Sequence, residues 1–167
     1  MGYEVTIVNI AKLLARIVPV LAITTTASGA DPGTAAKAEF LNSPQTAQRD
    51  LPFSEAVRAG DFLFLSGALG FDDATGKVVP GGIGPETRQT LQHIKTTLER
   101  YGASLSDVIK CTVFLADIAE WPAFNNVYRE VFKKPYPARS ALGANGLALG
   151  ARVEVECIAY VPATRKK

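Results

Sequence analysis

The segment from Phe62 to Ser66 constrains the fold more than any other part of this chain of 167 residues. Because neighbouring side chains of a strand point to opposite faces, Phe62 and Phe64 lie on one face and Leu63 and Leu65 on the other. A strand that is apolar on both faces is normally buried on both faces. The sequence therefore predicts a sheet that is packed against other structure on both faces.

Strand-like and helix-like patterns alternate through the rest of the chain. A turn at Ala59-Gly60-Asp61 joins a strand at 54–58 to the one at 62–66. Apolar residues at three- and four-residue steps predict a helix from Gly84 to Gly102 and a second one from about Trp121 to Phe132. Further strands are predicted at 39–42, 108–115, 138–142 and 152–161, with only a short edge segment at 77–79 and turns at 43–50 and 67–70.

The order of these elements, β-β-β-α-β-α-β-β, predicts the fold class. It indicates an α+β two-layer domain, with a mixed sheet and both helices on one face. No third helix is left to cover the other face, so the sequence predicts that the chain self-associates into a homo-oligomer.

The chain begins with a segment that differs from the predicted domain. Lys12 and Arg16 precede an apolar run at 17–23, which leads into small residues up to Ala30. This layout predicts a cleaved secretory signal at 1–30 and therefore export, to the periplasm in a bacterium, with no membrane segment in the mature form. Glu4 and Pro19 fit the layout poorly, so a cytoplasmic N-terminal extension is the alternative. We assign a linker to 31–37, the domain to 38–163 and a basic tail to 164–167.

Composition excludes several kinds of site. The net charge of +2 is dispersed, so nothing in it indicates a nucleic-acid partner. Cys111 and Cys157 lie far apart and form no metal-binding motif with the lone His93, so we interpret them as core thiols and His93 as a solvated surface group. No nucleophile elbow, Walker loop or dinucleotide fingerprint is present. We expect no metal and no cofactor.

Three charged residues near the end of the chain are the candidates for chemistry. Arg139 lies among small, apolar residues, where a charged guanidinium is unfavourable unless it pairs with an anion. Glu154 and Glu156 lie on one face of the last strand. Arg139 and a glutamate could form a structural ion pair. Alternatively, Arg139 binds a substrate carboxylate while Glu154 holds or deprotonates a water. Spacing alone leaves both interpretations open.

Several segments, in order along the chain, resemble the Rid (YjgF) family of enamine/imine deaminases. The resemblance covers nearly all of residues 38–161. It is carried by Leu65-Ser66-Gly67, the helix at 89–98, the strand at 107–115, Asn125 with Tyr128, Pro137-Ala138-Arg139-Ser140, and the strand at 153–159.

The resemblance implies a chorismate-mutase-like α+β fold and a homotrimer with sites between subunits. It implies cofactor-free hydrolysis of reactive 2-imino or enamine acids, such as 2-aminoacrylate and 2-iminopropanoate, to 2-oxo acids and ammonia. By the same comparison, Arg139 binds the substrate carboxylate, Glu154 positions the water, and Ser66 and Asn125 line the site.

The sequence departs from the family pattern at three positions that concern the substrate. Phe53 stands where a tyrosine is usual, Ala141 where cysteine is frequent, and Gly143 where an acidic residue is frequent. An alternative function is therefore a non-catalytic module that binds a small metabolite in the same intersubunit pocket. A ribonuclease is a third possibility, but the sequence shows neither a basic face nor an aromatic platform for RNA.

Overall fold

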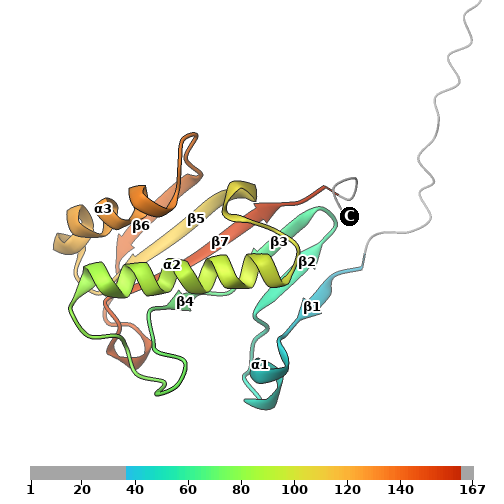
Figure 1. Cartoon of the computed structure of the whole chain (residues 1–167), viewed down its shortest axis with the longest axis horizontal. Helices are drawn as coiled ribbons and strands as arrows, with labels where there is room; N and C mark the ends of the chain where they lie inside the picture. Colours follow the sequence, from blue (N-terminus) through green and yellow to red (C-terminus); the bar gives the residue numbers. More distant parts are fainter. Residues whose placement is uncertain (1–36, 163–167) are drawn as a thin grey trace, which may run out of the picture. The chain divides into compact units, whose positions relative to one another are not determined.

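The computed structural model describes residues 37–162, which form one mixed sheet with helices against it. The strand order is β1-β2-β3-β7-β5-β6, with the short β4 also paired to β7 (Figure 1). β6 runs parallel to β5, and every other pairing is antiparallel. The strands are β1 Glu39–Leu41, β2 Ala56–Ala59, β3 Phe62–Leu65, β4 Ala68–Leu69, β5 Val108–Leu115, β6 Ala138–Gly143 and β7 Val153–Tyr160. The helices are α1 Pro44–Gln48, α2 Ile83–Arg100 and α3 Trp121–Val131, with short 3-10 turns at Leu105–Asp107, Ile118–Glu120 and Ala148–Gly150.

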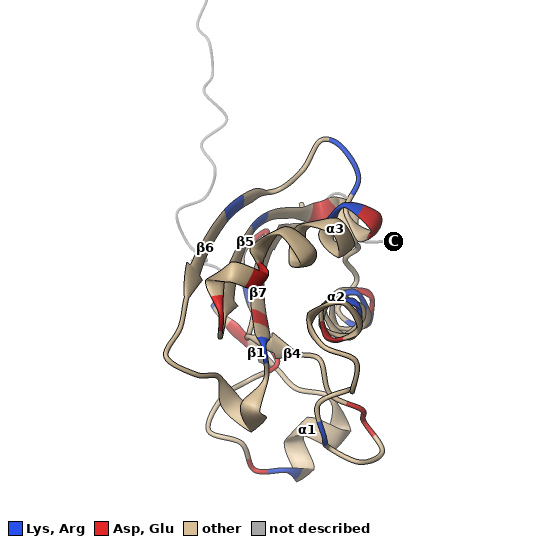
Figure 2. Cartoon of the chain, turned by 90° about the vertical axis from the view of Figure 1, so that its left-hand side faces the viewer, with Lys and Arg blue, Asp and Glu red and all other residues tan. Residues whose placement is uncertain are grey.

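The core lies between the sheet and the two long helices, which pack on the same side of it (Figure 2). Every second residue of β7, from Val153 to Ala159, is buried, as strand alternation requires. The facing side of α2 buries Leu91, Ile94 and Leu98. The α+β class, the mixed sheet and the two long helices predicted from the sequence are confirmed.

The other face of the sheet carries aromatic side chains that are left uncovered by residues 37–162. Leu63 is fully buried, whereas Phe62 and Phe64 are 41% and 42% exposed and Tyr160 is 43% exposed. The rings of Phe62 and Tyr160 are in contact, with centroids 5.4 Å apart. Among the described residues, the expected burial of β3 on both faces therefore holds for the helix side only. Coverage of the aromatic face by other copies stays a prediction.

Two short segments differ from the sequence-based assignment. The polar stretch at 43–50 contains α1, because Ser43 caps the helix by accepting a hydrogen bond from the Thr46 amide at 3.2 Å, and Pro44 suits the first turn. The predicted turn at 67–70 contains β4. The short edge segment expected at 77–79 takes part in a single bridge, between Phe71 and Val78.

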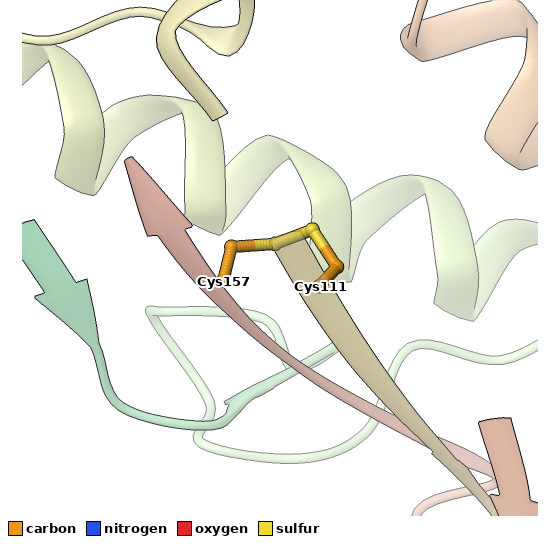
Figure 3. Close-up of a disulfide and its surroundings, with 2 residues drawn as sticks. All are labelled: Cys111 and Cys157. Carbon is orange, nitrogen blue, oxygen red and sulfur yellow. A yellow bond between two sulfur atoms is a disulfide. The ribbon is translucent and has the colours of Figure 1, made fainter. Parts of the chain in front are cut away.

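The two cysteines are joined in a disulfide, so their interpretation as free core thiols was wrong. Cys111 of β5 lies directly opposite Cys157 of β7, and their Cα atoms are 4.1 Å apart (Figure 3). Both side chains are buried on the helix side of the sheet. The pairing follows from strand order, because β5 and β7 are distant in sequence but adjacent in the sheet.

The predicted signal, most of the linker and the basic tail lie outside the described residues. Within residues 37–162, no helix has the length and apolar character needed to cross a bilayer.

Candidate functional site

Arg139 projects from the edge strand β6 onto the aromatic side of α3. Its guanidinium carbon lies 4.4 Å from the ring centroids of both Trp121 and Tyr128. Nη2 donates a hydrogen bond of 2.7 Å to Oδ1 of Asn125. The three residues that contact the guanidinium, Trp121, Asn125 and Tyr128, lie on one face of α3, because residues spaced by three, four and seven positions share a helix face.

These contacts leave part of the hydrogen-bond donor capacity of Arg139 unpaired. Nη1 is shielded from solvent and has no hydrogen-bond partner among residues 37–162. Burial lowers the pKa of Arg139 below its usual value, with the neighbouring charge of Arg129 acting in the same direction, but an arginine stays protonated at any physiological pH. A half-buried cation stacked on aromatic rings, with unpaired donor capacity, is suited to a carboxylate ligand.

Glu154 lies on β7, between Leu69 of β4 and Phe114 of β5. Burial raises the pKa of its carboxyl group, and the nearby charge of Glu156 raises it further. The carboxylate lies directly against the backbone of Gly67, where an added Cβ would come within 2.8 Å of the Glu154 Cδ atom and closer still to Oε1. A carboxylate with a raised pKa is better matched to proton transfer near neutral pH than an ordinary glutamate.

Ser66 and Phe53 belong to the same part of the molecule as Gly67. The three residues line a cavity of about 720 Å³ that extends along α2. The Ser66 hydroxyl donates a hydrogen bond of 2.6 Å to the carbonyl of Ser54, which fixes the chain at the end of β3. Phe53 lies at the surface and is 53% exposed.

The sequence-predicted site residues therefore form two separate groups in one chain. The arginine half-site consists of Arg139, Asn125 and Ala141. The glutamate half-site consists of Glu154 together with Ser66 and Phe53, which line the cavity beside it; Gly67 lines that cavity and lies against Glu154, whereas Glu154 itself does not line it. Arg139 is on the helix side of the sheet, whereas Glu154 alternates with the buried β7 residues and so is on the opposite side. Arg139 pairs with Cys111 of β5, and Glu154 pairs with Phe114 of β5. These two β5 residues are three positions apart, so their side chains also point to opposite faces of the sheet. Within the chain, Arg139 bonds to Asn125 and to neither candidate glutamate, so the interpretation as a structural Arg–Glu pair is not supported there.

Sequence reasoning missed three polar residues near these half-sites. His93 is no solvated surface group: its side chain is 17% exposed, lines the cavity, and makes a 2.8 Å hydrogen bond through Nδ1 to the carbonyl of Leu69. Glu55 bonds to both α1 and the end of α2. Glu86 is fully buried and accepts a 2.6 Å hydrogen bond from the Arg152 amide. Only Glu86 carried a sequence signal, an acidic residue in the first turn of a helix.

Comparison with known proteins identifies the family. The family model described as Endoribonuclease L-PSP matches residues 42–161. A RutC family protein from Pyrococcus horikoshii is 45% identical over 109 residues, which is 65% of this chain and 86% of that protein. A 2-iminobutanoate/2-iminopropanoate deaminase from Dermatophagoides farinae is 37% identical over 122 residues, covering 73% and 95% of the two chains.

Solved structures agree with this result. The crystal structure of RidA from an Antarctic Psychrobacter aligns with a TM-score of 0.64 and 36% identity, over 67% of this chain and 90% of that one. The crystal structure of yeast Mmf1 aligns with a TM-score of 0.66 and 32% identity, over 75% and 99%. The chain has the α+β fold of these proteins, and it belongs to the Rid (YjgF) family that its sequence motifs indicated.

Proposed function

We propose that this protein hydrolyses reactive 2-imino acids and their enamine tautomers to 2-oxo acids and ammonia. The observation that carries the proposal is the Arg139 guanidinium, held between aromatic rings and Asn125 while Nη1 has no partner within residues 37–162. Relatives named as 2-iminobutanoate/2-iminopropanoate deaminases support the reaction class.

The proposed reaction needs only a bound anion and a positioned water. Arg139 pairs with the substrate carboxylate and fixes the neighbouring imine carbon. Glu154 accepts a proton as a water oxygen bonds to that carbon, giving a tetrahedral carbinolamine. Transfer of protons to the nitrogen and loss of the C–N bond release ammonia and leave the 2-oxo acid. The imine carbon is already electrophilic, so this chemistry calls for no cofactor.

The proposal includes assembly, because Arg139 and Glu154 lie on opposite faces of the sheet. A complete site forms when the arginine half-site of one copy meets the glutamate half-site of another. Because the side chains of Phe62, Phe64 and Tyr160 are exposed, burial of this aromatic face against further copies would be favourable. We infer a homotrimer with three such sites.

The experiment compares wild type with Arg139→Ala and Glu154→Gln in the hydrolysis of freshly generated 2-iminopropanoate. Loss of the general base should lower kcat/KM by about 100-fold or more, and loss of Arg139 should raise KM for the anionic substrate. Arg88→Ala and Glu99→Gln, exposed residues outside both half-sites, are the matched controls. Wild type that releases ammonia no faster than buffer refutes the deaminase, and tight binding of a 2-oxo acid without turnover would then identify the binding module.

We also infer that the protein acts outside the cytoplasm. The Cys111–Cys157 disulfide supports this, because structural disulfides persist mainly in exported proteins. Expression of the full chain in a bacterium, followed by fractionation, thiol titration and mass measurement, tests it. The expected product lacks its first residues, is found in the periplasm and has no free thiol. Uncleaved cytoplasmic protein with two free thiols would contradict the inference.

A further inference from the structure

An apolar strip continues from Arg139 along β6. Side chains alternate along a strand, so Ala141 and Gly143 lie on the same face as Arg139. A Cβ added at Gly143 would lie 3.5 Å from Cβ of Ile118, so Ile118 borders the same surface. We call Ala141, Gly143, Ile118 and the neighbouring Trp121 the β6 strip.

The β6 strip is accessible and carries no charged side chain. Ile118 is 52% exposed, Ala141 and Gly143 are exposed, and Trp121 is half-buried beneath the guanidinium of Arg139. Ala141 and Gly143 are the two smallest residue types, so space remains above the backbone at these two positions of β6. An exposed isoleucine and an indole beside that room offer apolar contact to whatever enters it.

The position of the β6 strip relative to Arg139 determines what it can contact. A carboxylate on Arg139 places the rest of a ligand within a few ångströms of the guanidinium. Trp121, Tyr128 and Asn125 contact that group from α3, so a ligand that extends away from α3 runs along β6. Ala141 follows at roughly 7 Å and Gly143 at roughly 13 Å, from the rise of a strand. A methyl group on the imine carbon stays beside the guanidinium, whereas an isobutyl or benzyl group extends onto the near end of this surface, at Ala141 and Trp121.

We propose that the 2-imino acids selected by this protein carry a branched aliphatic or aromatic side chain, which packs on the β6 strip. This inference rests on the proposed deaminase function and narrows its substrate class. Ala141 and Gly143 make the strip accessible, and Ile118 and Trp121 provide its apolar contacts. These residues determine specificity and take no part in the proton transfers.

The test is a comparison of two substrates that differ only in side chain. 2-Imino-4-methylpentanoate and 2-iminopropanoate are generated in place from leucine and alanine by an amino-acid oxidase, and the kcat/KM of each is measured above the uncatalysed rate. A single methylene in a closed pocket discriminates by about 10- to 200-fold, and the small Ala141 and Gly143 leave room beside the ligand, so we expect a preference at the lower end, about tenfold, for the larger substrate.

Two variants examine the β6 strip itself. Ala141→Val narrows its near end, and Ile118→Ser removes its apolar edge. Each should reduce the ratio of the two kcat/KM values toward one. Ile109→Ser, which changes an isoleucine that is 44% exposed but outside the strip, is the matched control and should keep the ratio. A wild-type ratio of one or below, or a ratio that neither strip variant changes, overturns the inference.

Binding measurements separate failure of this inference from failure of the proposed function. Calorimetry with 4-methyl-2-oxopentanoate and 2-oxopropanoate requires no turnover. If neither imine is hydrolysed but the larger oxo acid binds about tenfold more tightly, and Arg139→Ala abolishes that binding, the β6 strip selects its ligand and the deaminase function is refuted. Equal binding of the two oxo acids, or binding of neither, overturns the inference.

Discussion

At the scale of single residues, both half-sites depend on neighbours that have no catalytic chemistry. Asn125 accepts one hydrogen bond from Arg139 and thereby orients the plane of its guanidinium. Gly67 lets the Glu154 carboxylate lie directly against the main chain, in space that any side chain would fill. The reactive groups are therefore placed by the residues around them as much as by their own strands.

Replacing Gly67 should remove activity without unfolding the protein. In Gly67→Ala, the new methyl group occupies the position of the Glu154 carboxylate, which must rotate away because its end is the movable part of the contact. We expect hydrolysis to fall by about 100-fold, as after loss of a general base, with an unfolding free energy within about 1 kcal/mol of wild type. Kinetics and urea denaturation measure the two. Gly84→Ala, where an added Cβ meets no atom within 4 Å, is the control, and full activity in Gly67→Ala would contradict this account.

The pH dependence of the reaction should change when Glu156 loses its charge. Burial, and then the negative charge of Glu156, raise the pKa of Glu154 above its usual value. Removing that charge favours the ionised form of Glu154, so its pKa falls. Wild-type kcat/KM should drop on the acid side as Glu154 becomes protonated, and in Glu156→Gln the drop should come at a lower pH. An acid limb that stays in place, or moves to higher pH, is incompatible with Glu154 as the base.

The sequence singled out candidate site residues where a side chain contradicts its surroundings, and their roles stay predictions. Arg139 in a small, apolar strand and the paired glutamates of β7 were recognisable for that reason. His93 and the cysteines were misread because their partners are distant in sequence: His93 of α2 meets Leu69 of β4, and Cys111 meets Cys157, only in the folded domain.

At the scale of elements, α1 is held in place by one carboxylate. Glu55 accepts hydrogen bonds from the side chains of Ser43 and Thr46 at the start of α1 and from the Tyr101 hydroxyl at the end of α2. Arg100 adds an ion pair of 3.0 Å. Desolvation by itself would raise the pKa of Glu55, but these partners outweigh it and lower the pKa to about 2. Since α1 leads into the loop that carries Phe53, this network also fixes one wall of the cavity.

Neutralising Glu55 should therefore destabilise the protein in a pH-dependent way. A carboxyl group whose pKa is lowered on folding stabilises the folded state above its unfolded value, and that contribution is lost as pH falls from about 4.5 towards 2. At pH 7 we expect Glu55→Gln to reduce the unfolding free energy by about 1–2 kcal/mol, allowing for partial exposure. Denaturation at pH 7 and near pH 2.5 measures this, with Glu99→Gln as control. A deficit of the same size at both pH values would contradict the assignment.

The long elements were predictable and the short ones were not. α2, α3, β5 and β7 carry enough periodic apolar positions for their type and approximate bounds to follow from the sequence. α1 and β4 have five and two residues, too few for a pattern, and they exist because Glu55 and β7 hold them. Strand order, and with it the separation of the two half-sites, is set by long-range pairing that no local pattern encodes.

At the scale of the whole molecule, one chain presents the two proposed half-sites with Arg139 and Glu154 on opposite faces of the sheet. This arrangement makes hydrolysis a property of the proposed assembly. It also gives a test that depends on geometry alone, because a defect in one half-site can be compensated by a neighbouring copy.

Mixing two inactive variants should restore part of the activity. Arg139→Ala retains an intact glutamate half-site, and Glu154→Ala retains an intact arginine half-site. When equal amounts are unfolded together and reassembled, random association leaves about one site in four with both residues, so about a quarter of wild-type activity should return. Activity is measured after confirming the assembly by light scattering. A mixture as inactive as its components would show that both residues serve the same site from one chain.

The disulfide has a consequence for how this molecule withstands proteolysis. Cys111 and Cys157 enclose β6, α3 and the exposed turn around Leu149, which is 65% exposed. A protease that cuts at this turn separates Arg139 and Glu154 into different polypeptides, yet the crosslink keeps both pieces in one particle. Cleaved protein would therefore run as a single band until a reductant is added, and the enclosed segment would stay attached to the sheet after the chain is broken.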